Sequence, residues 1–157
     1  MKLIFKRFEE LNTKELYRIL KARIEVFAVE QDCVYQDCDN KDFNAFHMYY
    51  EKNDEIVAYI RILDKGISYD EISIGRVLVN ENYRFQGISS KLMNAGIDFI
   101  KKVLNENSIR ISAQAHLIHF YGQLGFVKVS DEYLEDNIPH IEMLYTDNSN
   151  GYKKDDL

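Results

Sequence analysis

The chain has 157 residues, of which 46% are hydrophobic and 29% charged, as is ordinary for one globular domain. Its formal net charge of −6 argues against nucleic acid as a partner, because nucleic-acid binding needs a basic face. No stretch reaches the roughly 20 apolar residues of a membrane-spanning helix, and the N-terminus lacks the features of a signal peptide, so we expect a cytoplasmic protein with no membrane partner.

Taken in chain order, hydrophobic alternation, helical spacing and turn residues predict ten elements. They are a strand at Lys2–Phe8, a helix at Thr13–Ala28, strands at Ala45–Glu51, Glu55–Leu63 and Ile72–Val79, a helix at Gly87–Leu104, a strand at Ile109–Ala113, a helix at Ala115–Leu124, and strands at Phe126–Val129 and His140–Tyr145. This β-α-β-β-β-α-β-α-β-β order predicts an α/β fold, with a mixed, mostly antiparallel central sheet and helices on both faces. We expect a single domain at residues 1–146 and a polar, frayed C-terminal tail at residues 147–157.

Several boundaries carry their own signals. Asn12, followed three positions later by Glu15, matches a capping box at the start of the first helix. The pair Asn53-Asp54 predicts a tight turn between two strands, and Gly125 suits the end of the last short helix.

Two polar connections stand out. The stretch Glu30–Phe43 predicts a long loop that shapes a substrate pocket, and Asp131–Pro139 predicts an acidic excursion between the last two strands. The loop holds the two cysteines, Cys33 and Cys38, which are too few for a disulfide scaffold. They suggest either a structural role or a metal site; because no C-x-x-C pair is present, we favour the first and expect no metal.

The strand at Ile72–Val79 leads into a loop with Arg84, Gln86 and Gly87, where a long helix begins. The first N–H groups of a helix lack internal partners and carry partial positive charge, and a glycine lets the backbone approach an anion closely. The pattern therefore predicts either an anion site of the kind that holds phosphates or a plain strand-to-helix turn.

These motifs resemble the GNAT N-acetyltransferases. Arg84-Phe85-Gln86-Gly87-Ile88-Ser89 matches two of the three fixed positions of the family signature Q/R-x-x-G-x-G/A, with Ser89 at the third. Phe120–Phe126 is similar to the F-Y-x-x-x-G-F motif of the same family. Further segments resemble the ElaA-like subgroup: Arg23–Gln31, Tyr35-Gln36 with Asp39, His47, Ala113–His116 and Glu135–Ile141.

The resemblance implies acetyl-CoA as the cosubstrate. Its pyrophosphate would lie on backbone N–H groups of Gln86–Ser90, with Arg84 adding charge, and its pantetheine arm along Val77–Val79. The positions implied to contact the cofactor are Val77, Leu78, Val79, Arg84, Phe85, Gln86, Gly87, Ile88, Ser89, Ser90, Gln114 and Tyr121.

Acetyl transfer from a thioester to an amine needs an oxyanion donor, an acid and a base. A backbone N–H at Leu78 or Val79 would stabilise the oxyanion. In the family the tyrosine of the second motif faces the sulfur, so Tyr121 would protonate the leaving thiolate; the alternative is an aromatic that only packs. The candidates for the base are Glu30, His116, His140 and Glu142, or a water relay. His47 and Arg76 either line the pocket or stabilise the sheet, and His119 is expected on the surface.

The function that follows is an N-acetyltransferase that transfers acetyl from acetyl-CoA to a primary amine of a small molecule or peptide, by direct attack in a ternary complex. Two alternatives remain: a non-catalytic module that binds CoA or an acyl ligand, and an acyl-homoserine-lactone synthase. The sequence leaves the acceptor, and the choice between monomer and homodimer, undetermined.

Overall fold

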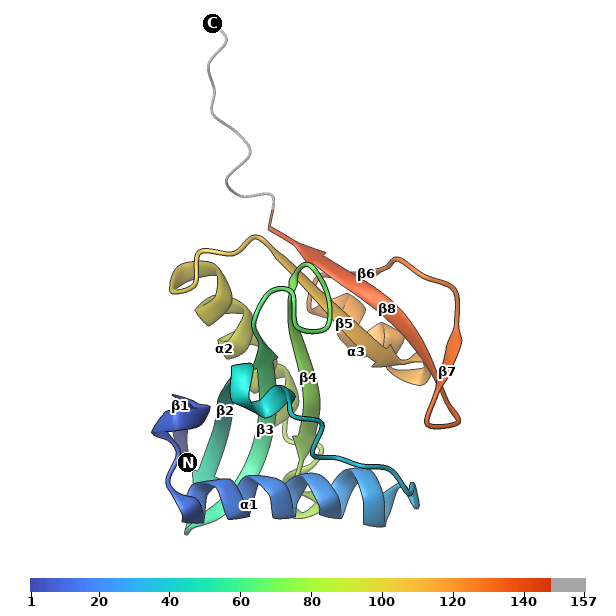
Figure 1. Cartoon of the computed structure of the whole chain (residues 1–157). Coiled ribbons are helices and arrows are strands. Elements are labelled where there is room, and N and C mark those ends of the chain that lie inside the picture. The colour runs from blue at the N-terminus through green and yellow to red at the C-terminus, as the bar shows by residue number, and fades with distance from the viewer. Residues whose placement is uncertain (148–157) are drawn as a thin grey trace, which may run out of the picture.

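The computed structural model describes residues 1–147, whose strands form one eight-stranded sheet (Figure 1). The strands are β1 (Lys2–Arg7), β2 (Ala45–Lys52), β3 (Glu55–Leu63), β4 (Ile72–Val79), β5 (Ser108–Gln114), β6 (Phe126–Lys128), β7 (Tyr133–Glu135) and β8 (Ile138–Thr146). They lie in the order β1-β2-β3-β4-β5-β8-β6, with β7 paired to β8. Only the β4–β5 pair is parallel, so the expected mixed, mostly antiparallel sheet is confirmed.

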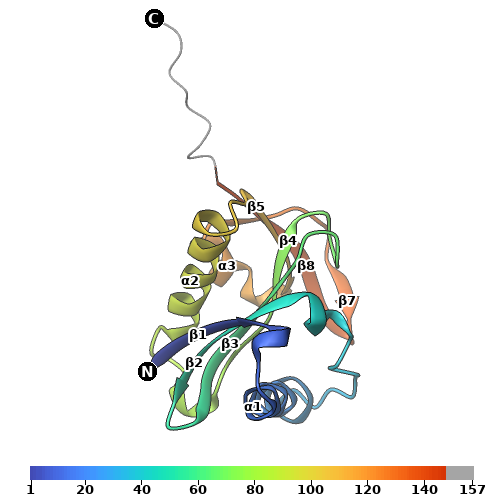
Figure 2. The ribbon, with the colours of Figure 1, turned by 60° about the vertical axis from the view of Figure 1, so that its left-hand side comes forward.

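Three α-helices cover the two faces of this sheet: α1 (Thr13–Ile24), α2 (Ile88–Lys102) and α3 (Ile118–Gln123). Figure 2 shows α1 on one side of the sheet and α2 and α3 on the other. Each face buries its own apolar cluster. The larger cluster lies under α2, where Leu92 and Met93 meet Ile60 and Ile74, and the smaller one joins Ile19 of α1 to the sheet.

The capping signals are confirmed. The Asn12 side chain accepts the N–H of Glu15 at 2.8 Å, and the Glu15 carboxylate accepts the N–H of Asn12 at 2.9 Å. Asn53 and Asp54 both have positive φ angles, as a two-residue hairpin turn requires. Gly125 follows α3 with φ +100°, a conformation that favours glycine.

The predicted helix over Thr13–Ala28 is confirmed as helical, but its last four residues are not α-helical. The α-helix ends at Ile24 and continues as a π-helix over Glu25–Glu30, so Glu30 belongs to helical structure and not to the loop. The N–H of Gln31 donates to Val26 O, five residues back. Apolar spacing did not reveal this change because a single wide turn is too short to alter the helical period visibly.

The acidic excursion Asp131–Pro139 is also more regular than expected, because it contains β7 and the first residues of β8. Asp136 and Asn137 have φ angles of 50° and 61° and form a two-residue turn between these strands. The last strand therefore starts at Ile138 instead of His140, and the sheet has eight strands instead of seven.

Two further boundaries differ. The expected helix Ala115–Leu124 begins as a 3₁₀ turn over Ala115–Leu117, and α3 follows it. Asp147 is not frayed, because its N–H donates to Asn107 O at 2.7 Å and its carboxylate lies 3.4 Å from Lys101 Nζ. The rest of the expected tail, residues 148–157, lies outside the described residues.

β4 and β5 diverge soon after they meet. Their ladder holds only two residue pairs, which begin with Ile72 opposite Ile109 and end with Ser73 opposite Arg110. Beyond Ser73 the β5-facing edge of β4 has no strand partner in the described chain, which opens a fork between the two strands. A bulge in β4, where Arg76 has a φ angle of 50°, lies beside this opening.

Candidate functional site

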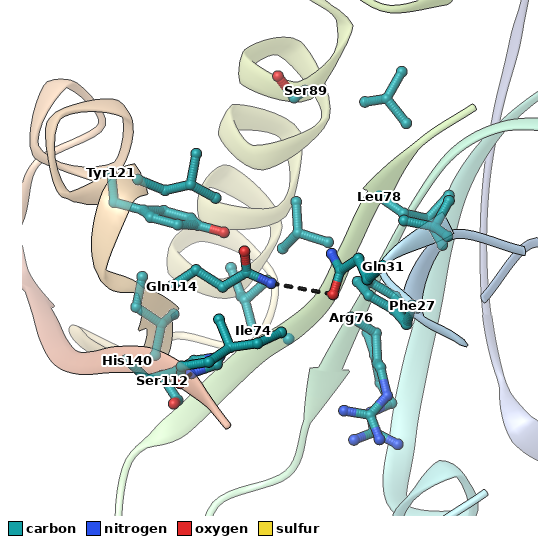
Figure 3. A pocket seen from close by; sticks show the side chains of 18 of the residues that line it. Phe27, Gln31, Ile74, Arg76, Leu78, Ser89, Ser112, Gln114, Tyr121 and His140 are labelled. Carbon is teal, nitrogen blue, oxygen red and sulfur yellow. Dashed lines mark hydrogen bonds between the residues drawn. The ribbon is translucent and has the colours of Figure 1, made fainter. Parts of the chain in front are cut away.

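The fork between β4 and β5 opens into a cavity of about 900 Å³. Its walls come from both sides of the molecule: the π-helix, β4 and the start of α2 on one side, and β5, α3 and the β7–β8 hairpin on the other. Gln114 Nε2 donates to Gln31 Oε1 at 3.5 Å, so one side-chain contact spans the two walls (Figure 3).

The first turn of α2 lies at one end of this cavity. Gly87 is its N-cap residue with φ +74°, and no side chain caps the turn. The first intrahelical bond is from Lys91 N–H to Gly87 O, so the preceding N–H groups have no helical acceptor. The turn holds no acidic residue, which leaves its partial positive charge available to an anion.

The predicted cofactor positions mostly line the cavity: Val77, Leu78, Val79, Arg84, Phe85, Gly87, Ile88, Ser89, Gln114 and Tyr121. Gln86 and Ser90 do not line it. Arg84 lies at the rim, where its Nε donates to Val79 O at 3.0 Å and its Nη2 lies 2.8 Å from Glu30. Phe85 is fully exposed and has a φ angle of 63°.

Tyr121 projects from α3 into the fork, with its hydroxyl directed at the open space between β4 and β5 (Figure 3). The residue is only 7% exposed, and its ring packs against Phe120 and Phe126. Within residues 1–147, no group hydrogen-bonds to the hydroxyl, although the atom is not sealed from solvent. Burial raises the pKa of Tyr121 to about 12, so the phenol keeps its proton at neutral pH.

The four candidate bases differ sharply in their surroundings. Glu30 and His116 are exposed at the rim, and Glu30 already pairs with Arg84. Glu142 lies outside the cavity lining. His140 lines the cavity and is 9% exposed, with Nδ1 2.7 Å from Ile138 O.

Two other histidines are set apart from the cavity. His47 is fully buried in β2, with its ring nitrogens 2.7 Å from Tyr59 Oη and 3.0 Å from Asp42 O, so it stabilises the sheet. His119 is exposed, as expected, and contacts Gln123.

Arg76 lines the cavity because the bulge turns its side chain out of the usual alternation of β4. Asp37, which sequence reasoning missed, holds it there. The Asp37 carboxylate lies 3.0 Å from Arg76 Nε, 2.9 Å from Arg23 Nε and 3.0 Å from Tyr35 Oη. Its carbonyl accepts further bonds from Arg23 and Arg76. One buried aspartate thus ties α1, the following loop and the β4 bulge together.

Among the other lining residues, Gln31, Ser112 and Glu135 were not named individually as site residues, although Gln31 lies in the loop that was predicted to shape the pocket. The alternation of β5 offered a signal for Ser112, since it shares a face with Gln114 two residues on. Glu135 offered two signals: it begins the segment Glu135–Ile141 that resembles the ElaA-like subgroup, and it precedes Asp136-Asn137, a pair that suits a hairpin turn. Among the described residues, no group of three or more His, Cys, Asp or Glu has an arrangement that fits a metal ion.

Comparison with known proteins identifies the family of this chain. Residues 12–146 match the family model described as an acetyltransferase (GNAT) domain. The chain belongs to the GNAT acetyltransferase family. As a GNAT protein it is ElaA-like: the protein ElaA of Escherichia coli K12 is 40% identical over 136 residues, which cover 85% of this chain and 89% of that protein.

Two crystal structures share the GNAT fold of this chain at substantial identity. Escherichia coli ElaA superposes with a TM-score of 0.86 and 37% identity, over 92% of this chain and 99% of that one. An acyl-CoA N-acyltransferase from Pseudomonas aeruginosa superposes with a TM-score of 0.88 and 36% identity, over 93% and 100%. GNAT enzymes typically use an acyl-CoA and an amine acceptor. No helix among residues 1–147 has the length and apolar character needed to cross a bilayer.

Proposed function

We propose that this GNAT protein is a cytoplasmic, acetyl-CoA-dependent N-acetyltransferase. Its acceptor is a primary amine of a small molecule or peptide, which attacks the thioester directly in a ternary complex. The observation that carries the proposal is the Tyr121 hydroxyl, which enters the fork from α3 and finds no hydrogen-bond partner in the described chain. A departing thiolate needs a proton donor, and a phenol in the cavity without a hydrogen-bond partner can supply that proton.

The residues present suit CoA. The uncapped first turn of α2, with Gln86–Ser90, supplies N–H groups for the pyrophosphate. The unpaired edge of β4 at Val77–Val79 supplies backbone groups for the amides of the pantetheine arm. Arg84 would have to exchange part of its contact with Glu30 for a phosphate, which is a small change because both side chains are partly exposed.

Strand alternation chooses between the two candidate oxyanion donors. Asn80 N–H donates to Val57 O on β3, so two residues earlier the Leu78 N–H also points toward β3. Val79 faces the other way, and its carbonyl accepts Arg84 Nε on that side. We therefore assign the oxyanion to the Val79 N–H rather than that of Leu78.

His140 is the proposed base. It is the one histidine that is both shielded and in the cavity lining among residues 1–147, whereas His116 and Glu30 lie at the rim. The amine arrives as an ammonium ion and gives one proton to His140. Its nitrogen lone pair then forms the C–N bond while the carbonyl becomes the oxyanion, and the collapse of this adduct breaks the C–S bond. Tyr121 gives its proton to the leaving sulfur, and the attacking nitrogen then gives its second proton to Tyr121. No free phenolate therefore accumulates. The net products are the amide, CoA thiol and the proton on His140.

Calorimetric titration with acetyl-CoA tests the first step, and thiol release with a panel of n-butylamine, spermidine and a lysine-containing peptide tests the second. In Tyr121→Phe we expect kcat to fall by about 10²-fold, with acetyl-CoA affinity unchanged. The control is Tyr17→Phe, because Tyr17 is 72% exposed on α1. Binding of acetyl-CoA without thiol release from any amine would favour the binding-module alternative. Unchanged kcat in Tyr121→Phe would refute the assigned acid.

A further inference from the structure

His140 belongs to a cluster of four polar side chains on the β5, β7 and β8 side of the cavity, here called the acceptor cluster: Ser112, Tyr133, Glu135 and His140. The Ser112 hydroxyl contacts Tyr133 Oη and donates to Glu135 Oε2 at 3.2 Å. The same Glu135 oxygen lies 3.3 Å from His140 Nε2. The rings of Tyr133 and His140 stack with their centroids 6.3 Å apart.

The position of the His140 proton follows from its partners. Nδ1 lies 2.7 Å from Ile138 O, and a carbonyl oxygen only accepts, so Nδ1 carries hydrogen in both charge states. A neutral His140 therefore presents a bare Nε2. That nitrogen faces a carboxylate oxygen, which cannot donate to it when ionised. The contact with Glu135 becomes an ion pair only after the imidazole has gained a proton at Nε2.

We infer that Glu135 is a positioning residue for acyl transfer: it stabilises His140 in the protonated form that exists just after the amine has lost its proton. Ser112 holds the carboxylate oxygen in place, and Tyr133 orders Ser112 and covers one face of the imidazole. Glu135 forms no bond to the substrate in this role. The inference rests on the proposed function, because it needs His140 to be the base.

The exposure of Glu135 suits a cycle in which the proton is taken and then released. Its side chain is 53% exposed, whereas the His140 side chain is 11% exposed. Water therefore screens the attraction enough for the proton to leave to solvent after each turnover, while the imidazole itself stays in a fixed orientation.

Other charged or titratable groups face this cluster from each neighbouring element. They are Glu142 on β8, Arg110 on β5, and Tyr69 and Glu71 in the connection before β4. Arg110 pairs with Glu71 at 2.9 Å and reaches Glu142 at 3.6 Å, so both of these carboxylates are engaged by Arg110. Burial raises the pKa of Tyr133 and that of Tyr69, so both phenols are neutral near pH 7. Glu135 is thus the anion paired with His140.

Glu135→Gln tests the inference, because glutamine keeps the shape and can still accept from Ser112. With acetyl-CoA and n-butylamine, we expect kcat/KM at pH 7 to fall roughly three- to tenfold. The acid limb of the pH profile should move to lower pH, since the imidazolium loses its anion. Glu135→Asp should recover part of the lost kcat/KM and part of the original position of the acid limb. The matched control is Glu132→Gln, an exposed carboxylate just before β7, which should leave the profile in place.

A second readout does not depend on turnover. The ring resonances of His140, followed by NMR against pH, should titrate at lower pH in Glu135→Gln than in the unmodified protein. Superposable titrations and pH profiles would overturn the inference, as would an equal shift in Glu132→Gln. His140→Gln separates the two levels of the argument: if it turns over normally, the proposed base is wrong, and if it is impaired while Glu135→Gln behaves normally, only the role of Glu135 is wrong.

Discussion

The substitution Asp42→Asn tests whether the buried charges under the sheet depend on one another. Asp42 Oδ1 lies 2.7 Å from Arg23 Nη1 and 3.0 Å from Arg61 Nη1, so a single oxygen serves two buried guanidinium groups. The Arg23 side chain is 0% exposed and that of Arg61 is 4% exposed. Asparagine has nearly the same shape, but it removes the negative charge and presents a donor where one acceptor oxygen was.

The expected loss of unfolding free energy depends on which ion-pair partners Arg23 and Arg61 keep in Asp42→Asn. Removing one partner of a buried ion pair costs about 3–5 kcal/mol, because the remaining charge is left without compensation. Here Arg23 still has Asp37 at 2.9 Å, and Arg61 still has Asp39 at 2.8 Å. Neither cation is stranded, so we expect a loss near the lower limit, about 3 kcal/mol of unfolding free energy.

Urea denaturation followed by circular dichroism measures this loss, with the m-value checked for two-state behaviour. The control is Asp54→Asn, since Asp54 is 86% exposed and lies 3.7 Å from Arg18. A surface pair of this kind contributes at most about 0.5 kcal/mol. A loss below about 1 kcal/mol in Asp42→Asn, or equal losses in the two variants, would refute the argument that these buried charges are coupled.

Two further predictions concern packing and pH. In Gly96→Ala, a Cβ would lie 2.6 Å from Ile60 Cδ1 in the closed core under α2; overpacking of about 1–3 kcal/mol then exceeds the gain in helix propensity of about 1 kcal/mol, so the melting temperature should fall. The matched control, Gly122→Ala, has open space around its Cβ and should not destabilise; if both variants melt alike, the close contact does not limit stability. Burial opposes ionisation of Asp39, but hydrogen bonds from Arg61 and the nearby positive charge lower its pKa to about 2. Ionised Asp39 therefore contributes about 1–2 kcal/mol to the unfolding free energy after solvent screening. This stabilisation should be complete above about pH 4 and lost as pH falls from about 4 to about 2. Asp39→Asn should flatten that decline in the unfolding free energy, and an unaltered acid limb would contradict the assignment.

Local signals located most of the fold. Asn12 and Glu15 fixed the start of α1, and alternation placed β3 and β4 at their observed bounds. Gly87 placed the start of α2 within one residue. These features depend on neighbours within a few positions along the chain, so the sequence displays them directly.

The parts of the site that escaped prediction depend on contacts between distant segments. Asp37 and Arg76 are 39 positions apart, and nothing near either residue announces their pairing. Glu135 approaches Ser112 and His140 only because a hairpin folds β7 onto β8. The resemblance supplied Tyr121 and His140 as candidates, but it offered no way to rank His140 above His116 or Glu30. The proposed ranking rests on burial and hydrogen-bond geometry, and both are properties of the packed chain.

The bulge at Arg76 shows how the buried charges and the open fork belong to one arrangement. A non-glycine residue with a φ angle of 50° costs about 1–2 kcal/mol. That strain persists because Asp37, 6% exposed, holds the guanidinium with both its carboxylate and its carbonyl oxygen. The bulge places one extra residue of β4 between the pairs Gly75–Arg61 and Leu78–Tyr59, and it thereby sets which N–H groups of β4 point to the fork. The polar loop after α1 therefore helps to fix the edge of β4 that borders the fork, because its Asp37 holds Arg76 in the bulge.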